Sequence, residues 1–282
     1  MLKILAFAKI NLYLHVTGRL PDGYHTLQTV MQTITLSDEL RILPNHGRDI
    51  VFTCNVPELE KRNNLVLKAC DLFSKTTGCT GGYEIHLEKR IPTAAGLGGG
   101  SADAAATLCA LNHLYGAPLK ISELEKISLR LGSDVPFFIR GGCALAESKG
   151  EVLTPLDKQT QYFYVLVKEG EKVSTGEMYA ALDRLPAAPD PQPADYKRLA
   201  NDIAYFYCST QNDFTAVSPL PQQVQADFIA AGAEQVLLSG SGPTCFSVFN
   251  DRISAQAVYE QLKKKYPLCF LVADAQSGSL LV

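Results

Sequence analysis

A run of glycines between Pro92 and Ala105 carries the most evident chemistry of this 282-residue chain. The segment reads Pro-Thr-Ala-Ala-Gly-Leu-Gly-Gly-Gly-Ser-Ala-Asp-Ala-Ala, so the glycines lead directly into strong helix formers. Glycine tolerates positive φ angles and lets backbone N–H groups approach a bulky anion, and the first turn of a helix beginning near Ser101 adds unpaired donors and a positive dipole. The pattern predicts a phosphate site at Gly96, Gly98, Gly99 and Gly100.

Spacing excludes two common phosphate-binding loops. The chain has no Gly-x-x-x-x-Gly-Lys-Ser/Thr, and the third glycine of a Gly-x-Gly-x-x-Gly pattern counted from Gly96 would fall on Ser101. A flexible turn before a helix is the remaining alternative. It explains the segment less well, because turns seldom hold four glycines in five positions.

The elements around the loop follow from hydrophobic periodicity. Apolar residues alternate with polar ones over 10–16, which is the period of a half-buried strand. Helical spacing predicts a helix over 64–77 that Gly78 ends, and the loop lies between a strand at 83–87 and a helix from Ser101 to Tyr115. Further strands are expected at 27–36, 40–43 and 50–54.

A second helix is expected after the glycine-loop helix. Ser122 and Glu125 have capping-box spacing, and Gly132 suits a C-terminal cap. Its apolar stripe would consist of Leu124, Ile127 and Leu131. The polar segment Ser-Asp-Val-Pro-Phe-Phe, with Asp134, follows it.

The second half of the chain starts a new pattern. A strand is expected at 162–168, and four prolines within 186–193 predict a loop. The order after that is helix (222–231), strand (235–238), a Ser-Gly-Ser-Gly-Pro turn, strand (245–249), helix (254–265) and strand (268–273). This is the order of a small α/β sandwich, which places a domain boundary near residue 157.

Composition limits the class of protein. The chain is 46% hydrophobic and 20% charged with a net charge of −3, and its longest basic run is three lysines at 263–265, so no nucleic-acid partner is expected. The eight cysteines are never closer than nine residues, which excludes Cys-x-x-Cys metal or redox sites. Apolar runs are too short for a membrane span, and Lys9 and Asn11 interrupt the apolar N-terminus. We therefore expect a cytoplasmic protein with no membrane partner.

Three motifs together resemble the GHMP kinases, a family of small-molecule kinases. They are Ala-Lys-Ile-Asn-Leu at 8–12, the glycine segment at 92–105, and Ser-Gly-Ser-Gly-Pro-Thr-Cys at 239–245. The resemblance spans nearly the whole chain and implies an α+β fold of two domains. It implies a ribosomal-protein-S5-domain-2-like ATP-binding domain over 1–157 and a ferredoxin-like domain over 158–282.

Three further segments resemble one branch of that family. They are Ala-Lys-Ile-Asn-Leu-Tyr-Leu, Asp-Gly-Tyr-His-Thr-Leu-Gln and Gly-Ser-Asp-Val-Pro-Phe-Phe. The resemblance implies that ATP, with Mg²⁺, phosphorylates the 2-hydroxyl of a methylerythritol unit carrying a diphosphocytidyl group. That step belongs to the non-mevalonate route to isoprenoid precursors.

By the same resemblance Lys9 and Asp134 are the catalytic pair. Asp134 would accept the proton of the substrate hydroxyl as the O–P bond forms. Lys9 would hold the carboxylate ionised and stabilise charge on the transferring phosphoryl group. A buried ion pair without chemistry is the alternative.

The resemblance also assigns the two ligand sites. Residues expected at the diphosphocytidyl substrate are Asn11, Tyr24, His25, Lys149, Thr175, Tyr179, Ser239 and Gly240, with the two tyrosines stacking on cytosine and His25 hydrogen-bonding its edge. Residues expected at ATP are Asn64, Leu65, Lys89, Pro92, Ala95, Gly96, Gly98, Gly99, Gly100, Ser101 and Asp103. Three alternatives stay open: a core position for Tyr179, a helix cap for Asn64, and a plain strand-connecting turn for 239–242.

The chain departs from the family pattern at Ala102, where Ser-Ser-Asp/Asn is usual. Only Ser101 offers a hydroxyl there, so we expect ATP oxygens and water to hold Mg²⁺, with at most Ser101 as a protein ligand. Two competing functions are a related kinase acting on another alcohol and a binding protein without activity. The acidic balance and the presence of both Lys9 and Asp134 speak against the second.

Overall fold

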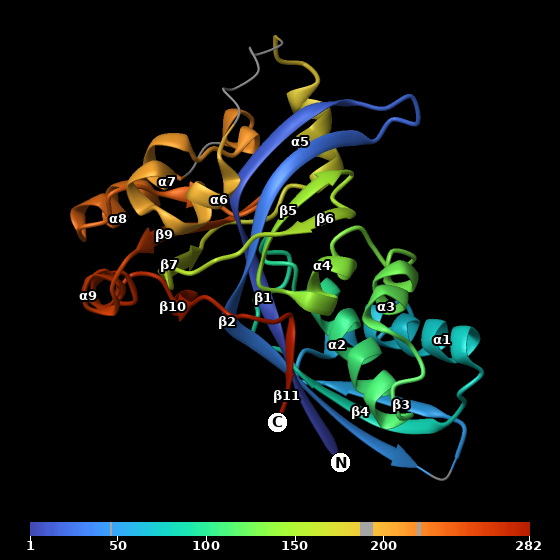
Figure 1. Ribbon diagram of the computed structural model, residues 1–282. Helices are drawn as coiled ribbons and strands as arrows, with labels where there is room; N and C mark the ends of the chain where they lie inside the picture. The colour runs from blue at the N-terminus through green and yellow to red at the C-terminus, as the bar shows by residue number, and fades with distance from the viewer. Residues whose placement is uncertain (46, 187–193, 219–220) are drawn as a thin grey trace.

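Two long antiparallel strands form the axis of the molecule (Figure 1). The computed structural model describes residues 1–45, 47–186, 194–218 and 221–282. β1 (Leu2–Arg19) and β2 (His25–Asn45) pair along nearly their whole length, with irregularities in register after Phe7, Asn11 and Val16. The expected strand at 10–16 lies within β1, and those at 27–36 and 40–43 are parts of the single strand β2.

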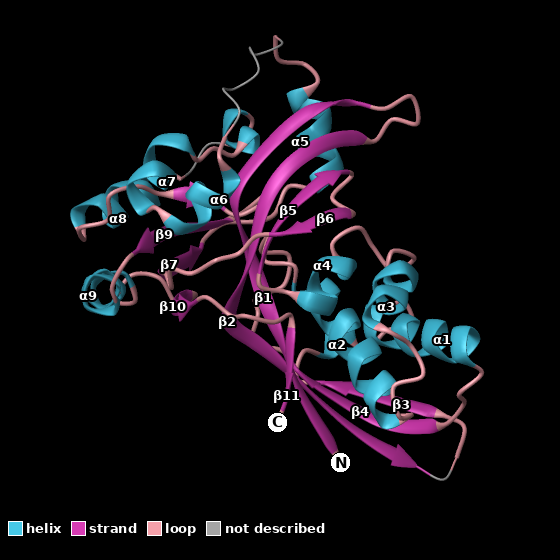
Figure 2. Cartoon of the chain, in the orientation of Figure 1, coloured by secondary structure: helices cyan, strands magenta, loops and turns pink. Residues whose placement is uncertain are grey.

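The larger sheet grows outward from this pair. Within the described residues it contains seven strands in the order β11-β1-β2-β4-β3, while β5 pairs with β2 and β6 pairs with β5. The remaining bounds are β3 (Ile50–Cys54), β4 (Gly82–Glu88), β5 (Cys143–Ser148), β6 (Val152–Pro155) and β11 (Ser279–Leu281). Helices α1 (Leu65–Thr77), α2 (Gly99–Leu114), α3 (Ile121–Ser128) and α4 (Val135–Arg140) lie together on one side of it, and a short 3-10 helix, η1, covers Pro57–Leu59 (Figure 2).

The helix that follows the glycine loop starts earlier than expected. α2 begins at Gly99 rather than at Ser101, and Gly98, in the left-handed region with φ 71°, stands at its N-cap. Its alanine-rich face packs into the core beneath the sheet. Gly99 and Gly100 are therefore helical, and only the first two glycines use the positive φ that glycine permits.

The cap predicted for the next helix is wrong. α3 begins at Ile121, with Lys120 at the N-cap and a capping interaction from Glu123, so Ser122 and Glu125 make no capping box. Glu125 pairs with Arg140 of α4 instead. The helix ends at Ser128, before Gly132, and turn hydrogen bonds from the Arg130 and Leu131 N–H groups follow it.

The smaller sheet is ferredoxin-like. Its strands follow the order β10-β7-β9-β8, all antiparallel, and α8 and α9 complete a βαββαβ unit. The bounds are β7 (Phe163–Lys168), α8 (Gln222–Ala230), β8 (Leu237–Leu238), β9 (Thr244–Phe249), α9 (Arg252–Leu262) and β10 (Cys269–Ala273). Between β7 and α8 the chain forms α5 (Thr175–Leu182), α6 (Tyr196–Asn201), α7 (Ile203–Ser209) and the 3-10 helix η2 (Asp213–Ala216).

The two sheets share one core, so the boundary near 157 stays a prediction. Ile10 and Leu12 of β1 pack in the same cluster as Tyr164 of β7 and Phe246 of β9. The last strand, β11, returns to the larger sheet and pairs with β1. Of the proline-rich segment expected as a loop, 187–193 lies outside the described residues.

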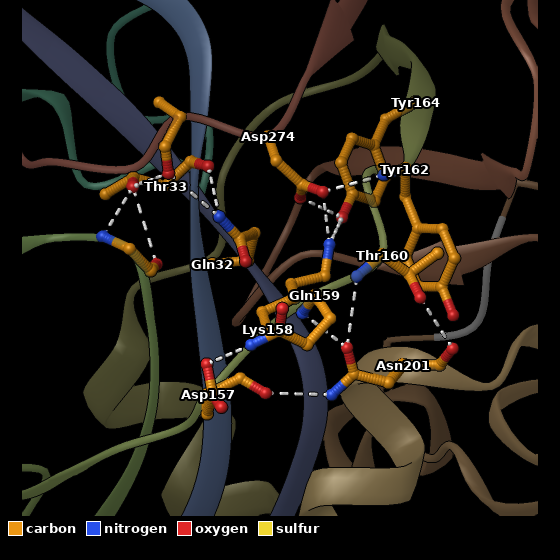
Figure 3. Close-up of polar contacts among 12 residues, drawn as sticks. Gln32, Thr33, Asp157, Lys158, Gln159, Thr160, Tyr162, Tyr164, Asn201 and Asp274 are labelled. Carbon is orange, nitrogen blue, oxygen red and sulfur yellow. Dashed lines mark hydrogen bonds and ion pairs between the residues drawn. The ribbon is translucent and has the colours of Figure 1, made fainter.

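A buried ion pair ties the two sheets together at this junction (Figure 3). Lys158 pairs with Asp274, which bridges to Ile34 of β2 and also accepts hydrogen bonds from the Tyr162 backbone N–H (2.7 Å) and the Tyr164 hydroxyl (2.6 Å). Both charged side chains are at least 96% buried, since their exposed fractions are 4% and 0%. Burial lowers the pKa of Lys158.

Lys158→Met is expected to destabilise the fold by about 3–5 kcal/mol, because it leaves the Asp274 carboxylate buried without its counter-charge. Urea unfolding measures the change. Lys263→Met, which removes an exposed pair with Glu260, is the matched control and should change the free energy of unfolding far less than Lys158→Met does. Equal stabilities of the two variants would contradict this role of the junction.

The described part of the chain contains neither a membrane-spanning helix nor a disulfide bond. None of its helices is long and apolar enough to cross a membrane. Its eight cysteines are all free, and five of them are buried.

Candidate active site

One cleft of about 1180 Å³ collects almost every residue singled out in the sequence. Its walls come from β1 and β2, the glycine loop, the segment before α4, and α5. Of the expected site residues only Ser239 is absent from its lining. A cleft of this size exceeds the usual range for one small ligand, about 300–1,000 Å³, and has room for two.

The glycine loop forms one end of the cleft. Gly96 and Gly98 have φ of 79° and 71°, and no side chain caps α2. The first-turn N–H groups of α2 therefore face an open end with the positive end of the helix dipole. A Cβ on Gly98 would lie 2.6 Å from the Phe138 ring, so any larger residue there would displace the loop.

A second tight turn, 239–242, closes on the loop from the smaller sheet. The Gly242 N–H donates to the Ser239 carbonyl (2.9 Å), and a Cβ on Gly96 would lie 2.3 Å from that same carbonyl oxygen. The buried Ser239 hydroxyl donates to the Gly96 carbonyl (3.2 Å), so Ser239 lies behind the cleft wall. Gly240 does line the cleft. The segment is thus both a strand-connecting turn and a brace for the glycine loop.

Lys9 lies between the two turns. Its exposed fraction is 5%, its Nζ donates to Asn11 Oδ1 (2.5 Å), and Asn11 in turn donates to the Thr29 hydroxyl (2.8 Å). A Cβ on Gly240 would lie 3.4 Å from Lys9 Nζ. Burial lowers the pKa of Lys9, and the charge of Asp134 opposes that shift.

Asp134 stands at the N-cap of α4 without capping it. Its side chain makes no cap hydrogen bond, although N-cap aspartates commonly do. The carboxylate lines the cleft and is close enough to Lys9 and Tyr179 to shift the pKa of each. The residue thus supplies a carboxylate whose position is set by the backbone, beside a buried ammonium.

Asn64 caps α1, which bears out one of the two roles left open for it. Its Oδ1 accepts from the Val66 N–H (2.8 Å), and its Nδ2 donates to the Leu59 carbonyl (2.9 Å). Asn64 and Leu65 line the cleft beside the start of α2. A direct contact to a nucleotide stays a prediction for both.

Lys89 is held by two buried carboxylates directly behind the glycine loop. Its Nζ pairs with Asp38 and lies 2.7 Å from Asp103 Oδ2, and a Cβ on Gly99 would lie 2.8 Å from that nitrogen. Asp38 also accepts from the Arg90 and Ile91 backbone N–H groups (2.6 and 2.8 Å). The lysine therefore anchors the loop.

Burial shifts the carboxyl group of Asp103 in this cluster toward its protonated form. Burial raises the pKa of Asp103 to about 8, with Asp38 adding to the shift and Lys89 opposing it. The Asp103 Oδ1 is buried with no hydrogen-bond partner in the described structure. With Asp103 protonated, the ammonium and the Asp38 carboxylate balance, and no net negative charge stands behind the phosphate end of the cleft.

We expect the KM for ATP to rise about threefold to tenfold between pH 7 and pH 9. Asp103 is protonated below its pKa of about 8 and ionised above it, so raising the pH places a second negative charge behind the loop. Asp103→Asn mimics the neutral form and should keep the KM flat over this range. Identical pH profiles of KM for the two proteins would contradict the assignment.

An aromatic group forms the other end of the cleft. His25, the first residue of β2, stacks on Tyr179 of α5 with ring centroids 4.4 Å apart and an interplanar angle of 9°. Tyr179 also meets Phe214 edge-on at 5.0 Å and packs against the core of the smaller domain. It is therefore both a core contact and part of the cleft wall.

Tyr24 and Lys149 lie at the rim. Tyr24 is 63% exposed, and Lys149 Nζ lies 4.4 Å from its ring centroid and 2.6 Å from Asp22 Oδ2. Thr175 and Ser241 also line the cleft, with their hydroxyls 3.1 Å apart. An exposed aromatic face next to a cation is free to stack on a flat ligand.

A magnesium ion would find few protein ligands here. In the described segments no three His, Cys, Asp or Glu side chains gather at a metal-binding distance. Ser101 lines the cleft at the first turn of α2, and Ala102 is buried. Because Mg²⁺ keeps most of its waters and accepts phosphate oxygens, the site fits an ion that enters with a nucleotide.

Some residues at the site escaped sequence reasoning. Asp38 falls between the strands expected at 27–36 and 40–43, and the structure places it, fully buried, inside the single strand β2. Asp183, Arg19 and Lys172 line the cleft or face it without any local signal, since their partners lie far away in the chain. Thr29 completes the hydrogen-bond chain from Lys9.

Comparison with known proteins shows the family of the chain. Residues 64–142 match the N-terminal domain of the GHMP kinases and residues 193–268 match their C-terminal domain. A 4-diphosphocytidyl-2-C-methyl-D-erythritol kinase of Lachnoclostridium phytofermentans is 37% identical over 93% of both chains, and one of Clostridium novyi is 39% identical over 93% of this chain and 95% of that one.

Solved structures give the same result. A crystal structure of 4-(cytidine 5'-diphospho)-2C-methyl-D-erythritol kinase superposes with a TM-score of 0.83 at 32% identity, covering 97% of this chain and 99% of that chain. Homoserine kinase from Cytophaga hutchinsonii, 20% identical with a TM-score of 0.74 over 100% of this chain and 97% of its own, shares the fold. The chain belongs to the GHMP kinases, within the family of 4-diphosphocytidyl-2-C-methyl-D-erythritol kinases.

Proposed function

We propose that the chain transfers the γ-phosphoryl group of ATP to the 2-hydroxyl of 4-diphosphocytidyl-2-C-methyl-D-erythritol, a step toward isoprenoid precursors. One observation carries this proposal: a single cleft joins an uncapped glycine loop, the Lys9 and Asp134 pair, and an aromatic end formed by His25 and Tyr179. The first part suits a triphosphate and the last a pyrimidine. The pair between them suits the reacting hydroxyl.

Different residues bind the phosphates, accept the proton and stabilise charge during phosphoryl transfer. The N–H groups of the loop and α2 hold the phosphates, and Asp134 accepts the proton of the substrate hydroxyl as its oxygen attacks. The Lys9 ammonium stabilises charge on the phosphoryl oxygens in a site that burial keeps at low dielectric. Mg²⁺ bound to ATP would supply charge neutralisation for the phosphates, and Ser101 is the residue expected to offer it a protein ligand.

The aromatic end separates this substrate from simpler alcohols. Mevalonate and homoserine carry no base, so a kinase specific for either has no use for the stack of His25 and Tyr179. An ADP-release assay with the cytidylated substrate, mevalonate and homoserine tests the proposal. We expect turnover with the first, while preference for either of the others would overturn it.

Tyr24→Ala is expected to raise the KM for the cytidylated substrate about tenfold and to change kcat little, because stacking on a base is worth roughly 1–3 kcal/mol. Steady-state kinetics at saturating ATP measure both constants. The control is Tyr259→Ala, because Tyr259 is distant from the cleft and also lies beside a lysine. A KM unchanged by Tyr24→Ala would remove this residue from the pocket.

A further inference from the structure

The His25 ring is fixed by a residue from the opposite half of the chain. Its Nε2 lies 2.8 Å from Asp183 Oδ1, which follows directly after α5. The ring also stacks on Tyr179, and its side chain is only 8% exposed. Two contacts thus determine both the plane of the imidazole and the direction of one nitrogen.

The contact with Asp183 determines which nitrogen carries the proton. The hydrogen bond from His25 holds the pKa of Asp183 below its usual value, so the carboxylate is ionised near neutral pH and can only accept. The hydrogen of a neutral His25 must therefore lie on Nε2, and Nδ1 is an acceptor. Nδ1 has no hydrogen-bond partner among the described residues, and His25 lines the cleft.

We propose that Asp183 is a positioning residue that makes His25 a hydrogen-bond acceptor toward the cleft and so selects a pyrimidine with an exocyclic amino group. Cytosine presents an N4 amino donor where uracil presents an O4 acceptor. An acceptor on the protein pairs with the first and faces the lone pairs of the second. This inference rests on the proposed function and concerns the choice between cytidylated and uridylated substrates.

Arg19 determines how the side-chain amide of Asp183→Asn would be oriented. Its Nη1 lies 3.3 Å from Asp183 Oδ2 and can only donate. In Asp183→Asn the amide oxygen turns toward Arg19, which leaves the amide NH₂ facing His25 Nε2. That nitrogen must then accept, so the proton moves to Nδ1 and the group facing the cleft becomes a donor. The variant inverts the hydrogen-bond character of His25 while keeping its shape.

The test measures kcat and KM for the cytidine and uridine forms of the substrate. We expect the wild-type protein to favour the cytidine form in kcat/KM, and Asp183→Asn to reduce that preference about 100-fold, mainly through KM. Asp227→Asn is the matched control, because it removes a carboxylate that pairs with Lys265 away from the cleft. It should keep the preference within about twofold.

Nitrogen-15 NMR of the imidazole measures the tautomer directly. The resonances of His25 are assigned as those that are missing from the spectrum of His25→Gln. The proposal expects the proton on Nε2 in the wild type and on Nδ1 in Asp183→Asn. A wild-type tautomer with the proton on Nδ1, or an unchanged preference in a folded Asp183→Asn, would overturn it. If the wild type phosphorylates neither form, the proposed function fails, and the tautomer still decides the role of Asp183.

Discussion

Asp134→Asn should lower kcat by about 10³, within the range of 10²–10⁴ that general-base groups contribute. The amide keeps the shape of the carboxylate but cannot accept the substrate proton. No cap of α4 is lost, because the Asp134 side chain makes none. The KM values for both substrates should therefore stay within about threefold of the wild type.

Single-turnover measurements by rapid quench separate chemistry from product release in this variant. Asp227→Asn, which removes a carboxylate paired with Lys265 away from the cleft, is the control and should keep the wild-type rate. A phosphoryl-transfer rate for Asp134→Asn close to that of the wild type would remove Asp134 as the base. It would leave substrate positioning as the source of catalysis.

Lys9→Met should lower kcat about 10²- to 10³-fold, since removing one preorganised charge from the transferring group typically costs that much. Methionine keeps the apolar stem that packs beside Gly98 and removes only the ammonium. The Asn11 Oδ1 loses its donor, but its Nδ2 still holds Thr29. Measuring kcat and the KM for ATP shows whether the charge acts on the transition state or on binding.

Lys9→Arg is the companion variant. Arginine keeps the charge, but its guanidinium is larger and planar, while Gly98 and Gly240 leave little room around the side chain. We expect it to rescue less than about a tenth of the lost rate. Full rescue by arginine would show that charge alone matters there. An unchanged kcat in Lys9→Met would contradict the catalytic assignment.

Local pattern was enough to predict the elements that hold the site. Two predictions depended only on neighbours within a few residues: the strand from the alternation over 10–16 and the helix from the run of helix formers after Gly100. Both are confirmed, by β1 and by α2. The boundaries of helices depend on tertiary contacts as well. Capping-box spacing suggested Ser122, whereas the packing of α3 against α4 and the pairing of Glu125 with Arg140 moved the start to Ile121.

Contacts between distant residues could not be predicted in the same way. The Asp38 carboxylate reaches the Ile91 N–H across 53 positions, and Asp183 meets His25 across 158. Neither contact leaves a local trace, because each depends on the register of β2 and the place of α5. The return of β11 to the larger sheet is likewise a property of the complete fold.

The position of the new phosphate on the product tests the central claim most directly. In the proposed substrate C2 carries a methyl group and no hydrogen, so a phosphate on its hydroxyl has no P–O–C–H coupling. After turnover with ATP, proton-coupled phosphorus NMR should show one new phosphomonoester resonance without that splitting. A split resonance would place the phosphate on another hydroxyl and contradict the proposed reaction. The absence of any new phosphomonoester resonance, with folded protein, ATP and substrate present, would contradict it as well.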